Sequence, residues 1–129
     1  MKEVMAIIRM NKMNETKQAL AEAGINSLCA KDCLGRGKGT VKIPQHIEGA
    51  VERYADVIRE LGLSGRLVPK RMINVIVPDE LVKTTVNTII SVNKTGRSGD
   101  GKIFVMPVLE SWRVRTGESG DEVLDRVCP

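Results

Sequence analysis

The chain has 129 residues, which predicts one domain, and its formal net charge of +4 is spread along the sequence instead of forming a basic tail. Aromatic residues make up only 2% of the chain, which argues against modules that stack nucleic-acid bases on aromatic rings. No apolar run approaches the ~20 residues that span a bilayer, and the start of the chain lacks the apolar region of a signal peptide. We therefore expect a cytoplasmic protein with no membrane insertion and no nucleic-acid partner.

The cysteines and the histidine do not form a recognisable metal site. Cys29, Cys33 and Cys128 are odd in number, which disfavours a disulfide framework. Cys29 and Cys33 lack the second pair of ligands that a four-coordinate zinc site needs, and His46 is the only histidine. We expect reduced thiols and no metal ligands.

The first half of the chain predicts two strands around a helix. Residues 2–9 are a short apolar run typical of a buried strand, and residues 25–34 predict a second strand with one exposed face. Between them, apolar and small residues recur at helical spacing, with Asn11 as the N-cap and Gly24 just beyond the end. The inner residues of this helix are Met13, Thr16, Leu20 and Ala23.

The second half of the chain is also predicted to contain two strands around a helix. Residues 70–77 predict a third strand, Asp79 is the expected N-cap of a second helix, and residues 103–108 predict a fourth strand that Pro107 places at an edge or an end. The inner stripe of this helix is predicted to be Val82, Val86, Ile89, Ile90 and Asn93. The order βαββαβ predicts an α+β ferredoxin-like sandwich, an antiparallel sheet with two helices on one face.

The main candidate site lies at residues 95–105, TGRSGDGKIFV. Gly99 and Gly101 flank Asp100, so the backbone can turn sharply and approach a ligand without a Cβ in the way. Successive N–H groups in such a turn can form a concave anion site, and Arg97 and Lys102 add cations beside it.

Two arginines follow at a spacing of two. On an extended strand, Arg113 and Arg115 would present both guanidiniums on one face. Together with residues 95–105 they fit a cradle for a polyphosphate. The same residues also fit a hairpin turn with solvated charges, since glycine-rich turns are common.

Residues 35–68 hold two further patterns. The run Gly35-Arg36-Gly37-Lys38-Gly39 fits either a second phosphate-facing loop or a hinge. Residues 47–61 show helical periodicity, with one face formed by Ile47, Ala50, Val51, Tyr54, Val57, Ile58 and Leu61. This face either packs on the protein's own assembly or docks a partner, in which case Ile47, Val51, Tyr54 and Ile58 are the expected contacts.

Residues 95–105, together with Arg113-x-Arg115-Thr116-Gly117-Glu118, resemble the C-terminal signature of the PII nitrogen-regulatory signal proteins. Residues 6–9, 19–25 and 77–82 are similar to that family's first strand, first helix end and second helix entry. The match covers about residues 1–38 and 67–120. The lengthened loop and the sequence Gly-Arg-Gly-Lys-Gly most resemble the nitrogenase-linked branch of the family.

This resemblance implies a single domain over residues 1–129, with a T-loop at about 37–69 and a C-terminal tail at about 117–129. It implies a trimer that binds ATP or ADP in the clefts between subunits, as a sensor and not an enzyme. Carried over residue by residue, the nucleotide site of one subunit is Gly35, Gly37, Lys38, Gly99, Asp100, Gly101 and Lys102. Arg113 and Arg115 would reach the phosphates from a neighbouring subunit.

Two departures bear on the effector and on modification. Gly39 stands where the family usually has a glutamine that helps to hold magnesium and 2-oxoglutarate, whereas Lys70 matches the family's lysine. The resemblance therefore implies 2-oxoglutarate bound by backbone groups near Gly39 and by Lys70, with Mg²⁺ held through the nucleotide. The family's modified tyrosine has no clear counterpart, because Tyr54 lies in the apolar stripe of the predicted loop helix.

The partner classes remain open at the level of sequence. The subunits assemble with themselves or with a sister PII-like chain, and the expected target is nitrogenase or another protein of nitrogen metabolism. The alternatives are a PII protein that controls an ammonium channel or a biosynthetic enzyme and, from another class, a small ATP-using enzyme subunit.

Overall fold

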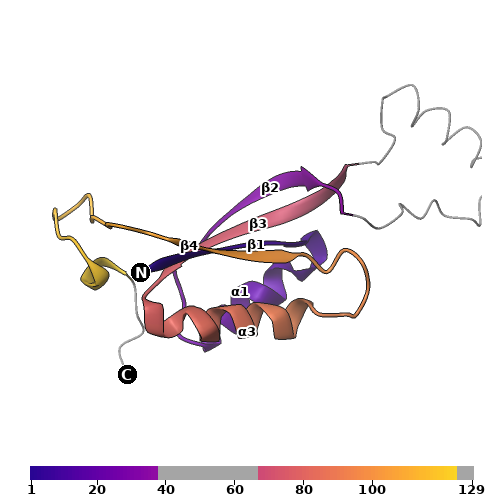
Figure 1. Ribbon diagram of the computed structural model, residues 1–129, viewed down its shortest axis with the longest axis horizontal. Coiled ribbons are helices and arrows are strands. Elements are labelled where there is room, and N and C mark those ends of the chain that lie inside the picture. Colours follow the sequence, from indigo (N-terminus) through magenta and orange to yellow (C-terminus); the bar gives the residue numbers. More distant parts are fainter. Residues whose placement is uncertain (38–66, 125–129) are drawn as a thin grey trace, which may run out of the picture.

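A computed structural model describes residues 1–37 and 67–124 of the chain (Figure 1). The predictions for Lys38, Gly39, His46 and the loop helix at residues 47–61 lie outside these described residues, as does Cys128.

Four strands form one antiparallel sheet in the order β2-β3-β1-β4. Their bounds are Lys2–Arg9 for β1, Cys29–Gly35 for β2, Val68–Val77 for β3 and Lys102–Pro107 for β4. Each pair of parallel strands, β1 with β2 and β3 with β4, is joined through a helix and separated by a third strand. The predicted ferredoxin-like βαββαβ fold is therefore confirmed, with Pro107 on an edge strand.

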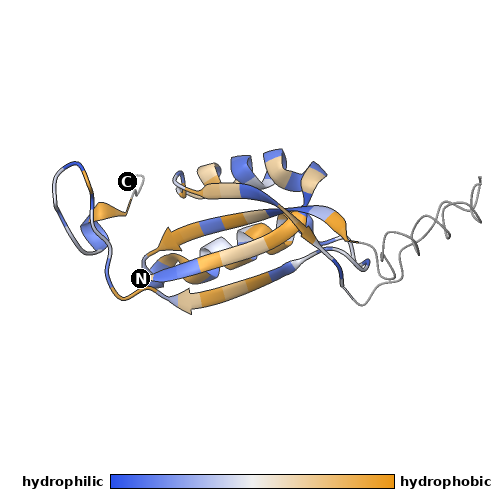
Figure 2. Cartoon of the chain, turned by 90° about the horizontal axis from the view of Figure 1, so that it is seen from above, coloured by the Kyte–Doolittle hydropathy of each residue, from blue (hydrophilic) through white to orange (hydrophobic). Residues whose placement is uncertain are grey.

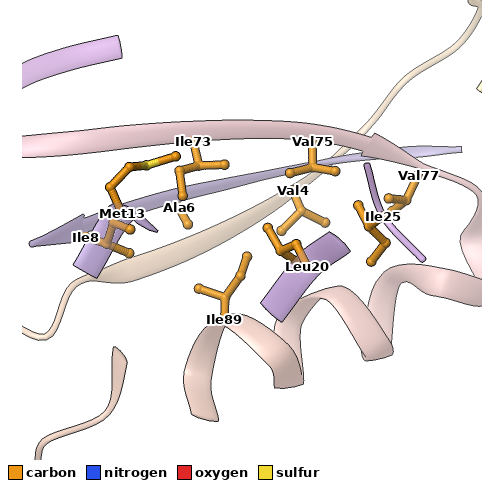
Figure 3. Packing of buried hydrophobic residues seen from close by; sticks show 10 residues of the cluster. All are labelled: Val4, Ala6, Ile8, Met13, Leu20, Ile25, Ile73, Val75, Val77 and Ile89. Carbon is orange, nitrogen blue, oxygen red and sulfur yellow. The ribbon is translucent and has the colours of Figure 1, made fainter. Parts of the chain in front are cut away.

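Two helices, α1 (Met13–Glu22) and α3 (Val82–Asn93), lie on the same face of the sheet (Figure 1). Because side chains alternate along a strand, every second residue of β1 and β3 points toward them. Figure 3 shows these residues meeting Leu20 of α1 and Ile89 of α3. The strand residues of this core are Val4, Ala6, Ile8, Ile73, Val75 and Val77, all almost fully buried. Full burial of each larger aliphatic side chain contributes about 1.5–3 kcal/mol before entropy is subtracted.

The opposite face of the sheet carries no helix of the described chain and is partly apolar (Figures 1 and 2). The strand register places six apolar side chains on this face: Met5, Ile7, Met72, Ile76, Phe104 and Met106. Ile76 and Phe104 are 37% and 44% exposed, and the amide of Asn74 donates a hydrogen bond to Glu3 between them at 2.6 Å. We call this surface the open face.

Both predicted N-caps are wrong. Asn11 lies inside a 3-10 turn, Met10–Lys12, and Asp79 lies inside another, Asp79–Leu81. Each helix begins directly after its turn and has no side-chain cap. Asp79 instead pairs with the N-terminal ammonium of Met1 at 3.0 Å. The hydrogen bond from that ammonium, helped by the charge of Lys2, lowers the pKa of Asp79. Gly24 follows the end of α1 with φ +87°, as predicted.

The inner stripe of α3 differs at two positions from the prediction. Ile90 is 44% exposed, whereas Thr85 is fully buried. The hydroxyl of Thr85 donates to the carbonyl oxygen of Leu81 at 2.7 Å, so its burial leaves no unpaired donor. At the other end of the stripe, Asn93 donates to the hydroxyl of Thr16 at 3.0 Å and links the two helices.

The first residues of two strands differ from the predicted ones by two residues or more. Strand β2 begins at Cys29, not residue 25, because Ile25 is buried in the core beneath the sheet before the chain joins the edge. Strand β3 begins at Val68, so Val68 and Pro69 pair with β2 and are not part of a loop.

Candidate functional site

A pocket of about 350 Å³ lies at the end of the sheet where β2 ends and β3 begins. It joins three segments that are far apart in the sequence. The first segment is the end of β2 and the residues just after it, with Gly35 and Gly37, and the second is β3, with Lys70. The third is the loop before β4 and the first residue of that strand, with Gly99, Gly101 and Lys102. We call it the glycine–lysine pocket. All six residues were singled out from the sequence, which could not show that they meet in one place.

The glycines of the loop are required by its geometry. Gly99 and Gly101 have φ values of +93° and +112°, a region that residues with a Cβ rarely adopt. A Cβ on Gly101 would lie 1.9 Å from the carbonyl oxygen of Ile7, so this part of the loop lies directly on β1. A Cβ on Gly99 would lie 3.3 Å from a guanidinium nitrogen of Arg9.

Two cations hold this loop from the sheet. Lys70 donates to the carbonyl oxygen of Gly99 at 3.0 Å, and Arg9 donates to the carbonyl oxygen of Ser98 at 2.9 Å. Arg9 and Lys70 are direct partners in the register of β1 and β3, so they reach the loop side by side. Sequence reasoning missed Arg9, although its position at the charged end of a buried strand was a usable signal.

Asp100 has different surroundings from its neighbours Gly99 and Gly101. It does not line the glycine–lysine pocket, and both oxygens of its carboxylate accept hydrogen bonds from within the protein. Arg9 donates to Oδ1 at 2.6 Å, and the backbone N–H groups of Thr95 and Gly96 donate to Oδ2 at 2.8 and 3.0 Å. The hydroxyl of Thr95 also donates to Oδ1. The Thr95 hydroxyl, and next to it Arg9, hold the pKa of Asp100 well below its usual range.

Arg113 and Arg115 do not lie on an extended strand, which corrects the sequence prediction. They belong to a hairpin closed by the bridge between Trp112 and Ser119, with Arg115 in the turn. Arg113 pairs with Glu118 at 3.0 Å, and its backbone N–H donates to the carbonyl oxygen of the same residue. Figure 1 shows this hairpin at the opposite end of the sheet from the loop before β4, which lines the glycine–lysine pocket. Within one chain the two arginines therefore cannot reach the pocket.

A larger pocket, of about 450 Å³, lies between α3 and β4. Its walls are mainly aliphatic, and Lys94, Asp100 and Lys102 also line it. The glycine–lysine pocket is smaller, but four glycines line it beside cations and no carboxylate is among its described lining residues, which suits an anion better than the larger pocket with Asp100.

The model of the nitrogen regulatory protein P-II family matches residues 1–118. The chain belongs to this family. The protein named "Nitrogen fixation nifHD region GlnB-like protein 2" of Methanobacterium ivanovii is 45% identical over 124 residues, which are 96% of this chain and 99% of that protein. The protein of the same name from Methanothermobacter marburgensis is 44% identical over 124 residues, 96% and 100% of the two chains. "Nitrogen regulatory protein P-II 1" of Escherichia coli is 36% identical over 126 residues, again 96% and 100%.

The PII resemblance is thus confirmed, and the names of the two methanogen relatives match its nitrogenase-linked branch. The family consists of regulatory signal proteins, and trimers of ferredoxin-like subunits are typical of it. Within residues 1–37 and 67–124, no helix is long and apolar enough to cross a membrane. The same residues contain no group of three or more His, Cys, Asp or Glu side chains placed to hold a metal ion.

Proposed function

We propose that this PII family member is a cytoplasmic sensor that binds ATP or ADP in the glycine–lysine pocket and controls a protein of nitrogen metabolism through its predicted T-loop between β2 and β3. The observation that carries the proposal is the meeting in one pocket of four glycines and two lysines: Gly35, Gly37, Gly99, Gly101, Lys70 and Lys102. The glycines let backbone N–H groups approach an anion closely, and the lysines supply positive charge. A polyphosphate needs this combination.

The remaining phosphate ligands would come from another subunit. Arg113 and Arg115 lie at the far end of their own sheet, so only a neighbouring copy can bring them to the pocket. A guanidinium fork matches phosphate oxygens better than an ammonium does, which is why two arginines suit this role. Arg113 would exchange its exposed pairing with Glu118 for the phosphate.

The open face supports assembly into a trimer. Its apolar side chains, including Met5, Ile76 and Phe104, gain about 25 cal/mol for each Å² of apolar area that a neighbour removes from water. The hydrogen bond from Asn74 to Glu3 pairs one donor with one acceptor among the polar groups that such contact would bury. The neighbours are further copies of this chain or of a sister PII-like chain.

We further propose that 2-oxoglutarate binds beside the nucleotide. Lys70 already donates to a neutral acceptor, the carbonyl oxygen of Gly99, and a carboxylate of the effector would replace it with a charge-assisted hydrogen bond. Gly39 offers backbone groups only, so Mg²⁺ would be held through the phosphates of the nucleotide.

Nitrogenase is the proposed target, supported by relatives whose names place them in nifHD regions. The loop residues Ile47, Val51, Tyr54 and Ile58 are the proposed partner contacts. The second candidate is control of an ammonium channel or a biosynthetic enzyme, as a PII protein outside the nitrogen-fixation branch. A small ATP-using enzyme is the third, and measurable ATP turnover by the purified protein would favour it.

Isothermal titration with ATP tests the nucleotide site directly. Lys102→Ala should weaken ATP binding about ten-fold or more, because a charge-assisted hydrogen bond is lost. Lys83→Ala, which removes an exposed lysine on α3 away from the pocket, is the matched control and should bind ATP like the wild type. Equal ATP affinity in the wild type and Lys102→Ala would refute the assignment of the pocket.

A further inference from the structure

The carboxylate of Asp100 is the centre of the loop that precedes β4. Its two oxygens receive four donors: the guanidinium of Arg9, the hydroxyl of Thr95 and the backbone N–H groups of Thr95 and Gly96. The side chain is about one-quarter exposed. A carboxylate gathered in by backbone N–H groups and a cation is bound as a free anion would be, except that it belongs to the chain.

This arrangement controls the backbone on both sides of Asp100. Its neighbours Gly99 and Gly101 both have positive φ, and neither has a side chain whose packing could restrict its backbone conformation. Fixing the Asp100 side chain fixes the peptide groups that join it to these two glycines. Those glycines line the glycine–lysine pocket, whereas Asp100 and Thr95 do not.

We propose that Asp100 is a positioning residue: through Arg9 and Thr95 it holds residues 95–101 in the conformation that receives a polyphosphate, and it does not touch that ligand itself. The proposal rests on the nucleotide function proposed above. A loop that is ordered before binding loses less conformational freedom when the ligand arrives, so its affinity is higher. The loop glycines would otherwise make that loss large.

Charge and positioning predict opposite results when Asp100 is neutralised. A negative charge close to the pocket repels phosphate, so its removal alone should strengthen the binding of ATP. If the carboxylate orders the loop, its removal should weaken the binding instead. Asparagine presents an amide N–H₂ group to one pair of the four donors, so Asp100→Asn disrupts the network while keeping the size of the side chain.

The experiment measures ATP affinity by calorimetry and amide hydrogen exchange in residues 95–101 for the wild type and three variants. Asp100→Asn should bind ATP about ten-fold more weakly and exchange faster in the loop. Thr95→Val deletes the hydroxyl donor without changing charge and should weaken ATP binding about two- to five-fold. The charge control is Asp32→Asn, which neutralises an exposed carboxylate of β2 that pairs with Arg71 of β3. It should change neither the ATP affinity nor the amide exchange of the loop.

The outcomes separate the two proposals. If the wild type does not bind ATP, the nucleotide function itself fails. If the wild type binds ATP and Asp100→Asn binds it equally or more tightly, only the positioning role fails. If Asp100→Asn does not fold, Thr95→Val decides, because it leaves every charge in place: unchanged ATP affinity and loop exchange in that variant would overturn the positioning role.

Discussion

Replacing Gly101 by alanine tests whether the loop before β4 is packed directly on β1. Gly101 has φ +112°, and a Cβ there would lie 1.9 Å from the carbonyl oxygen of Ile7. Real Cβ atoms essentially never approach other atoms within 3.0 Å, so the loop or the strand must separate by more than about 1 Å. Because the atom in the way is backbone in the middle of a sheet, a side-chain rotation cannot relieve the contact.

The expected cost has two parts. Holding alanine at a positive φ costs about 1–2 kcal/mol, and overpacking against β1 costs about 1–3 kcal/mol more. Gly101→Ala should therefore lower the free energy of unfolding by about 2–5 kcal/mol. Gly96→Ala is the matched control, because Gly96 also has a positive φ, +82°, but no atom lies within 4 Å of the Cβ position. It should lose only the first part, about 1–2 kcal/mol.

Urea unfolding followed by circular dichroism gives both values. The protein concentration must be the same in all samples, because subunit association makes apparent stability depend on concentration. A calorimetric ATP titration of the folded Gly101→Ala variant should also show weaker binding, since the displaced loop lines the glycine–lysine pocket. Equal stabilities for Gly101→Ala and Gly96→Ala would refute the close contact between the loop and Ile7.

Three further results are expected. Ile76→Asp on the open face should convert the trimer to monomers in light scattering, because it buries an unpaired charge, whereas a wild type that is itself a monomer would contradict the assembly. Because the pKa of Asp100 is lowered in the folded state, its stabilisation is present above the ordinary carboxyl value of 3.8 and is lost as the pH falls further. The stability difference between the wild type and Asp100→Asn in urea should therefore be larger at pH 7 than at pH 3. Val51→Asp combined with Ile58→Asp should abolish capture of the regulated partner and leave ATP affinity unchanged; loss of ATP binding would show that this stripe belongs to the folded core.

The elements of the fold could be predicted from the sequence because their signals are local. A strand buries every second residue, so Ile73, Val75 and Val77 could be assigned to one face before the sheet was known. The errors came from positions where a neighbour in space overrides the local pattern. Asp79 fits an N-cap in sequence, but the ammonium of Met1 lies 3.0 Å away and takes its carboxylate.

The candidate site divides in the same way. The glycines and lysines of the pocket could be predicted from the sequence. A glycine next to a cation allows close backbone approach to an anion, and this property does not depend on the rest of the fold. The roles of Arg9, Asp100 and the two hairpin arginines were decided only by tertiary structure. Arg9 and Asp100 are 91 residues apart, and the register of β1 against β3 and β4 brings them within 2.6 Å. Local sequence determines which residues can form a turn, a strand or a buried helix face. The strand register and the position of the C-terminal hairpin determine which of these residues come into contact, because contacts between distant segments depend on how the whole sheet is assembled.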